Sequence, residues 1–148
     1  MRRQTYRSVN IREDVGHPDR LAHYHPTSRS VPVIAAVLRT AATMVIASYG
    51  SGKSLAAGIG TVATVNDPAS HRFLLDVAAR IGKVDPGLGE MIAERASSGR
   101  RGKAVVLSGY VRDLPAAISS ALGLGQVDSV RKAVKAIRRI EDADRIAI

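Results

Sequence analysis

A glycine-rich stretch before a Lys-Ser pair is the part of this sequence best suited to chemistry. From Ala47 to Ser54 it reads Ala-Ser-Tyr-Gly-Ser-Gly-Lys-Ser, which fits the phosphate-binding pattern Gly-x-x-x-x-Gly-Lys-Ser/Thr at every specified position except the first. In such a loop, backbone N–H groups of the turn and of the following helix point at phosphate oxygens. The pattern therefore predicts a P-loop that binds a nucleoside triphosphate. ATP and Mg²⁺ are the expected ligands, with the choice between ATP and GTP left open.

The residue types in this loop have distinct expected roles. Lys53 is the expected catalytic residue, because the lysine of a P-loop reaches the β- and γ-phosphates, and Ser54 is the expected Mg²⁺ ligand. Glycine at positions 50 and 52 lets the backbone pass close to the phosphates. Ala47 replaces the first glycine, a change that is tolerated where φ stays negative. The complete predicted binding set is Ala47, Ser48, Tyr49, Gly50, Ser51, Gly52, Lys53, Ser54 and Leu55.

The pattern around the loop supplies the strand and the helix that a P-loop needs. The apolar, β-branched run Thr43–Ala47 predicts a strand buried on both faces, and residues 53–65, nearly all small or apolar, predict a buried helix. Alternation of strands and helices predicts an α/β protein with a mainly parallel sheet, a P-loop-like three-layer fold with helical inserts. Further helices are expected at 33–38, 70–81, 87–96, 114–122 and 127–140, and further strands at 103–108 and 145–148.

Two regions are expected along the 148 residues. Residues 1–31 are polar, basic and aperiodic, which predicts an extended or irregular N-terminal arm. Residues 32–148 are expected to be the front half of a P-loop domain, because no apolar run ends in the acidic residues that P-loop hydrolases use to hold Mg²⁺. The run Arg145–Ile148 is typical of the start of such a strand, and a genuine C-terminal edge strand is the alternative. Whether this chain alone hydrolyses ATP is therefore open.

The composition restricts the compartment and leaves the partners open. The chain has no cysteine, which excludes disulfides and thiolate metal sites. It has neither the apolar segment of a secretory signal nor an apolar run long enough to cross a bilayer, so a cytoplasmic protein without a membrane partner is expected. The net charge of +9 is compatible with a nucleic-acid partner. A basic helix face at 127–140 could lie along a phosphate backbone; its members are Arg131, Lys132, Lys135, Arg138 and Arg139.

Two segments resemble the large P-loop ATPases of bacterial anti-phage and DNA-modification-linked defence systems. They are the Tyr-Gly-Ser-Gly-Lys-Ser loop and the run Gly102–Gly109, which is followed by Arg-Asp-Leu-Pro at 112–115. From Thr43 to Ile148 the order of elements is similar to that family's plan, including a two-helix insert after the P-loop helix. The resemblance implies an ATPase motor or switch in a homo-oligomeric or multi-subunit assembly that handles DNA. It also implies truncation before the Walker B acidic residues.

Two alternative functions stay open. A small-molecule kinase also uses a Gly-x-Gly-Lys-Ser loop, but it needs a carboxylate to activate the acceptor and an arginine-bearing lid. The other alternative is a non-enzymatic nucleic-acid-binding module with a degenerate P-loop. Arg100 and Arg101, in the loop before the 103–108 strand, would supply the lid of a kinase. In an ATPase the same pair is a candidate arginine finger toward a neighbouring subunit's γ-phosphate.

Overall fold

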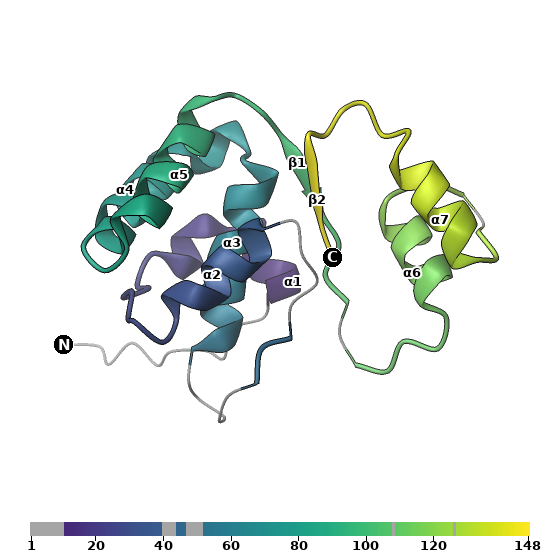
Figure 1. Cartoon of the computed structure of the whole chain (residues 1–148), viewed down its shortest axis with the longest axis horizontal. Coiled ribbons are helices and arrows are strands. Elements are labelled where there is room, and N and C mark those ends of the chain that lie inside the picture. The colour runs from purple at the N-terminus through teal and green to yellow at the C-terminus, as the bar shows by residue number, and fades with distance from the viewer. Residues whose placement is uncertain (1–10, 40–43, 47–51, 108, 126) are drawn as a thin grey trace.

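The computed structural model describes residues 11–39, 44–46, 52–107, 109–125 and 127–148. Over these ranges the chain is a mainly helical α/β protein with a small two-stranded parallel sheet (Figure 1). In chain order the elements are α1 (Ile11–Asp14), the 3₁₀ turn η1 (Pro18–Leu21), α2 (Val31–Leu38), α3 (Lys53–Val65), the 3₁₀ turn η2 (Pro68–Ser70), α4 (His71–Gly82), α5 (Pro86–Ser97), β1 (Gly102–Ala104), α6 (Leu114–Ala121), α7 (Val130–Ile137) and β2 (Arg145–Ala147).

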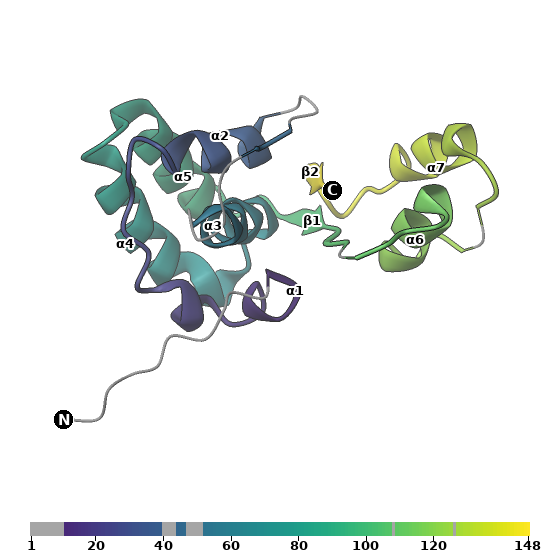
Figure 2. The ribbon, with the colours of Figure 1, turned by 90° about the horizontal axis from the view of Figure 1, so that it is seen from below.

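Helix α3 is the central element of the fold. Figure 2 looks nearly along it and shows α2 above it, α1 below it, the α4–α5 pair to its left and the sheet to its right. Its run of Ala, Gly, Thr and Val lets neighbours approach closely, and a Cβ built on Gly60 would lie 2.7 Å from Cβ of Val37 in α2. Ile59 and Val62 are fully buried in the resulting core. The prediction of a buried helix at 53–65 is therefore confirmed.

Helices α4 and α5 form a tight antiparallel pair. Asp85 ends the turn between them and caps α5, because its Oδ1 accepts a 3.0 Å hydrogen bond from the Leu88 N–H. The two backbones meet at glycines: a Cβ on Gly89 would lie 2.7 Å from Cα of Gly82 and 2.9 Å from the Ala78 carbonyl oxygen. Leu74 and Ile92 seal the apolar side of the pair against α3. The helices expected at 70–81 and 87–96 are confirmed with small changes at their ends.

The described part of the lead-in also packs on this core. Leu21 and Tyr24 are buried, and Arg80 of α4 donates hydrogen bonds from Nη1 to the carbonyl oxygens of Ala22 and Tyr24. The Tyr24 hydroxyl pairs with Ser30 Oγ at 2.7 Å, and burial raises the pKa of Tyr24 above its ordinary value. The described lead-in, residues 11–30, is therefore irregular but packed on the helical core.

The sheet consists of β1 and β2 side by side. Gly102 is opposite Arg145, Lys103 opposite Ile146 and Ala104 opposite Ala147 in a parallel register. The prediction that 103–108 and 145–148 contain parallel strands is confirmed, although each regular strand is only three residues long. The α6–α7 pair stands on the far side of these strands from the helical core (Figures 1 and 2). Helix α7 is also shorter than the expected 127–140.

The prediction of a buried strand at Thr43–Ala47 is wrong for Met44–Ile46. These three residues belong to no strand, and Met44 and Ile46 are more than four-fifths exposed; Thr43 and Ala47 lie outside the described residues. An apolar, β-branched run favours a strand only where a partner backbone completes the hydrogen-bond ladder, and no described strand pairs with this run. The three-layer P-loop architecture thus remains a prediction.

Arg95 joins the helical core to the sheet. From α5 its Nε donates to the Ala63 carbonyl oxygen at 2.7 Å and its Nη2 to the Thr64 carbonyl oxygen at 2.6 Å, so it satisfies the C-terminal end of α3. The same guanidinium makes a bidentate pair with Asp144, just before β2. Asn66 adds a second link, since its Nδ2 donates to the carbonyl oxygens of Arg95 and Arg100.

Substitutions at two glycines of α5 test how closely the backbones of α4 and α5 approach each other. Replacing Gly89 by Ala should lower the free energy of unfolding by about 1–3 kcal/mol, because the new methyl group meets backbone atoms that cannot move aside. Replacing Gly87 by Ala is the matched control: its Cβ would make ordinary contacts, so the substitution should raise stability by up to about 1 kcal/mol. Urea unfolding followed by circular dichroism measures both, and equal effects would contradict the packing described.

Arg95→Met should lower the free energy of unfolding by about 2–4 kcal/mol, because two carbonyl groups and Asp144 lose a charged donor. Arg72→Met is the control, since Arg72 is exposed on α4, and it should change stability by no more than about 0.5 kcal/mol. Urea titration measures the free energy of unfolding of both variants. A loss no larger for Arg95→Met than for Arg72→Met would rule out the role assigned to Arg95.

The Arg95–Asp144 pair also predicts a pH dependence. The hydrogen bond from Arg95 holds the pKa of Asp144 below its ordinary value of 3.8. A group whose pKa is lowered on folding stabilises the fold above its unfolded-state pKa and loses that contribution as pH falls through the folded-state value. The stability difference between wild type and Asp144→Asn should therefore be constant above about pH 5 and shrink below about pH 4.

Candidate nucleotide-binding site

The N-terminal end of α3 is the centre of the candidate site. Gly52 precedes the helix with φ of +78°, a left-handed conformation that is costly for any residue with a Cβ. Lys53 and Ser54 follow as the first two helical residues, and Gly52 and Ser54 are exposed. The described residues thus place a sharp turn, a cation and a hydroxyl at one solvent-facing helix end, as the sequence pattern requires.

Hydrogen-bond donors are concentrated at this end. The first bond that closes the helix runs from the Ala56 N–H to the Gly52 carbonyl oxygen at 2.9 Å, so the N–H groups of Ser54 and Leu55 lie ahead of the regular hydrogen-bond ladder of the helix. Helices α5, α6 and α7 carry Asp85, Asp113 and Ser129 as side-chain caps, whereas glycine at the N-cap of α3 provides no such acceptor. Together with the helix dipole and Lys53, these donors favour an anion.

The strands are oriented as a nucleotide site of this kind requires. The beginning of β1 abuts the C-terminal end of α3, where a Cβ on Gly102 would collide with the Thr64 carbonyl oxygen. From there β1 and β2 run back alongside α3 toward its N-terminal half (Figure 1). The carboxyl ends of the parallel strands therefore lie toward the same end of the molecule as Lys53, the end at which α/β proteins bind ligands.

The structure tests only part of the predicted binding set. Ala47, Ser48, Tyr49, Gly50 and Ser51 lie outside the described residues. Gly52, Lys53 and Ser54 come together at the helix end by continuity of the chain. Leu55 is half-buried, and its side chain packs against the hydrophobic core. It would therefore meet a phosphate only through its backbone N–H.

Acidic residues surround the opposite end of the sheet. Asp142 pairs with Lys103 at 2.8 Å and Asp144 pairs with Arg95, both at the start of β2. The residues that follow β1, from Val105 to Arg112, contain no Asp or Glu. β1 is thus not followed directly by a carboxylate that would complete a Mg²⁺ site beside Ser54.

Arg100 and Arg101 are exposed in the loop between α5 and β1. This loop contacts the C-terminal end of α3, because Asn66 there donates to the Arg100 carbonyl oxygen. At 1.5 Å per residue, the 13 residues of α3 separate that end from Lys53 by about 20 Å. The structure does not bring the two arginines to the candidate site of their own chain, and contact with a neighbouring subunit's nucleotide remains a prediction.

The described residues contain neither a candidate metal-binding group nor a candidate membrane span. They contain no group of three or more His, Cys, Asp or Glu side chains placed to hold a metal ion. No helix within the same ranges has both the length and the apolar character to cross a membrane.

Comparison with known proteins gives no relative for this chain. A scan against family models, a search of curated proteins and a search of solved structures each returned no match.

Two structural features, one side chain and one turn, were not predicted from the sequence. Arg95 was not singled out, and only its position in α5 beside the end of α3 reveals its role. The turn between α6 and α7 was also passed over, although its Gly-Leu-Gly sequence at 123–125 between two helical patterns was a usable signal.

Lys53→Ala should weaken binding of a fluorescent ATP analogue by about 10- to 100-fold, because a charge-assisted contact is worth about 1.5–3 kcal/mol. Lys83→Ala is the matched control, since it removes an exposed lysine at the end of α4. Fluorescence titration measures both affinities after circular dichroism has shown equal helix content. Unchanged affinity in Lys53→Ala would refute the assignment of the site.

Proposed function

We propose that this chain binds a nucleoside triphosphate, ATP with Mg²⁺, at the N-terminal end of α3. The phosphates bind the backbone N–H groups of the loop from residue 47 onward and of the first helical turn. Lys53 contacts the β- and γ-phosphates, and Ser54 contributes its hydroxyl to Mg²⁺. We further propose that the chain is the nucleotide-binding region of an ATPase that acts as a motor or switch in a larger, DNA-related assembly.

One observation carries the proposal. The Gly-Lys-Ser sequence begins a 13-residue helix through a left-handed glycine, with no side-chain cap and no acidic residue in the first turn. An ordinary strand-to-helix turn does not need this combination, whereas a phosphate site needs all of it. The burial of α3 among the other helices supports the proposal further, because it fixes the direction of the donors relative to the rest of the chain.

An ATPase is preferred to a small-molecule kinase for a chemical reason. A kinase must hold a carboxylate near the acceptor hydroxyl, and the residues that follow β1, from Val105 to Arg112, include none. A switch or motor can obtain its missing groups from another subunit, as trans-acting arginine fingers show in other NTPases. Arg100 and Arg101, exposed and distant from their own Lys53, suit that arrangement.

Turnover by residues 1–148 alone should be close to background even at saturating MgATP. Phosphoryl transfer requires a second group on Mg²⁺ and a group that orients water, and only Ser54 is assigned to the metal here. A phosphate-release assay measures the rate, with Lys53→Ala as the control for contaminating ATPases. Robust hydrolysis that depends on Lys53 would show that a catalytic carboxylate lies within these residues and would overturn this part of the proposal.

A further inference from the structure

Helices α6 and α7, the described part of the turn between them and the two residues after α7 form a unit, residues 114–125 and 127–139, that we call the α6–α7 hairpin. Each helix makes its main contacts with the other, and the hairpin stands apart from the helical core in both ribbon views (Figures 1 and 2). Asp113 caps α6 by accepting from the Ala116 N–H at 3.0 Å, and Ser129 caps α7 by accepting from the Lys132 N–H. The hairpin is therefore a defined structure whose outer surface is available to a partner.

One face of α7 carries only positive charge. Between Val130 and Ile140 the chain has five basic residues and no acidic one. Lys132 pairs with Asp128 at 2.7 Å. Within the described part of the chain the remaining four, Arg131, Lys135, Arg138 and Arg139, enter no ion pair, and all are exposed.

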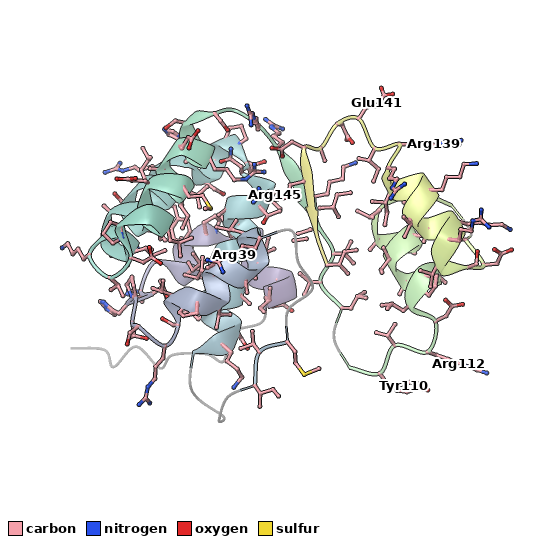
Figure 3. All side chains as sticks on the ribbon, in the orientation of Figure 1. Arg39, Tyr110, Arg112, Arg139, Glu141 and Arg145 are labelled. Carbon is pink, nitrogen blue, oxygen red and sulfur yellow. The ribbon has the colours of Figure 1, made fainter. Side chains whose placement is uncertain are left out.

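Arg131 and Lys135 lie on one side of α7, because positions i and i+4 of an α-helix are neighbours. Arg138, the C-cap residue in helical conformation, continues this side at position i+7, and Arg139 lies in the turn that follows; we call these four residues the basic stripe. Ala133, on the opposite side of α7, is buried inside the hairpin. Figure 3 shows Arg139 at the end of α7 and Glu141 on the link toward β2, beyond the stripe. This arrangement complements a regular line of negative charge.

The turn beside this stripe is open to close backbone approach. Gly123 and Gly125 have φ of +68° and +76°, and a Cβ built on either would have no atom within 4 Å. A shallow hollow of about 420 Å³ adjoins the turn, lined by Ala116, Ser120, Gly123, Gly125 and Val127. The N–H groups of Gly123 and Leu124 donate to the Ser120 and Ser119 carbonyl oxygens, so these glycines offer a phosphate group space for close approach and not free donors.

We infer that the α6–α7 hairpin binds the phosphate backbone of duplex DNA, with the turn and the basic stripe contacting one strand. Residues 111–141 contain no aromatic side chain, and recognition of single strands depends on stacking bases on aromatic rings. Helix α7, with eight residues, is about 12 Å long. That length spans about three base pairs of B-form DNA, whose major groove admits an α-helix, whereas the deep, narrow major groove of A-form RNA does not admit side chains.

The inference is tested by removing three positive charges from the hairpin in one variant and from the helical core in another. One variant carries Arg131→Gln, Lys135→Gln and Arg138→Gln; the control carries Arg29→Gln, Arg72→Gln and Lys83→Gln, three exposed residues of the helical core. Both lose three positive charges. Fluorescence anisotropy with a labelled 20-base-pair DNA duplex of random sequence, over a range of salt concentrations, gives affinity and salt dependence.

The hairpin variant should bind duplex DNA about 100-fold or more weakly at 0.1 M salt, and its slope of log K against log [salt] should fall by about 2–3, whereas the control should change little. Gly125→Asn, which tolerates the left-handed conformation but places a side chain beside the hollow, should weaken binding several-fold without loss of helix content. Equal losses in the two triple variants would overturn the inference. So would tighter binding of single-stranded DNA, duplex RNA or polyglutamate than of duplex DNA.

DNA binding by the hairpin and nucleotide binding at the N-terminal end of α3 can be tested independently. The hairpin variant should bind the ATP analogue as wild type does, because α6 and α7 contribute nothing to the candidate nucleotide site. Loss of DNA binding with normal nucleotide binding would support the inference, while loss of both would indicate a general folding defect and count against it.

Discussion

The arrangement of the chain depends most on the buried guanidinium of Arg95. A helix end exposes carbonyl groups that need donors, and the end of α3 is enclosed by α5 and the start of the sheet, where water has little access. Arg95 supplies the donors from α5, and its remaining N–H groups reach Asp144. One side chain thus links α3, α5 and the approach to β2. Arg145 acts similarly on the Leu38 carbonyl oxygen at the end of α2.

This linkage relates the fold to the candidate site. If α3 is held at its C-terminal end, its N-terminal end has a fixed direction relative to β1 and β2, and the donors of Lys53, Ser54 and Leu55 point to one region of space. An anion site gains from such preorganisation because little conformational entropy is lost when the ligand binds. The same rigidity keeps Arg100 and Arg101 at the far end of α3, so that the two ends of one helix have different chemical roles.

Sequence patterns predicted the elements whose information is local. Helix 53–65 was placed correctly because small apolar residues continue from Lys53 to the Asn66–Pro68 breaker. Asp67 caps the 3₁₀ turn η2 that leads into α4, and Asp85 caps α5. Met44–Ile46 was misassigned because strand formation depends on a partner that the run itself does not specify. The packing of residues 11–30 on the core could not be predicted, because Leu21 and Tyr24 are isolated apolar residues in a polar segment. For the site, the pattern identified Lys53 and Ser54 but not the distant contacts of Arg95.

The location of the hydrophobic core has a consequence for synthesis of the protein. Its buried members extend from Leu21 to Ala96, while the two strands must wait for residues 145–147. On a ribosome the helical core can therefore form as soon as α5 leaves the exit tunnel, with β1 still lacking a neighbour. Until β2 emerges, Arg95 holds α3 without its carboxylate partner, and the edge of β1 is open to other extended segments. Rapid translation of the codons between β1 and β2 would shorten that exposure.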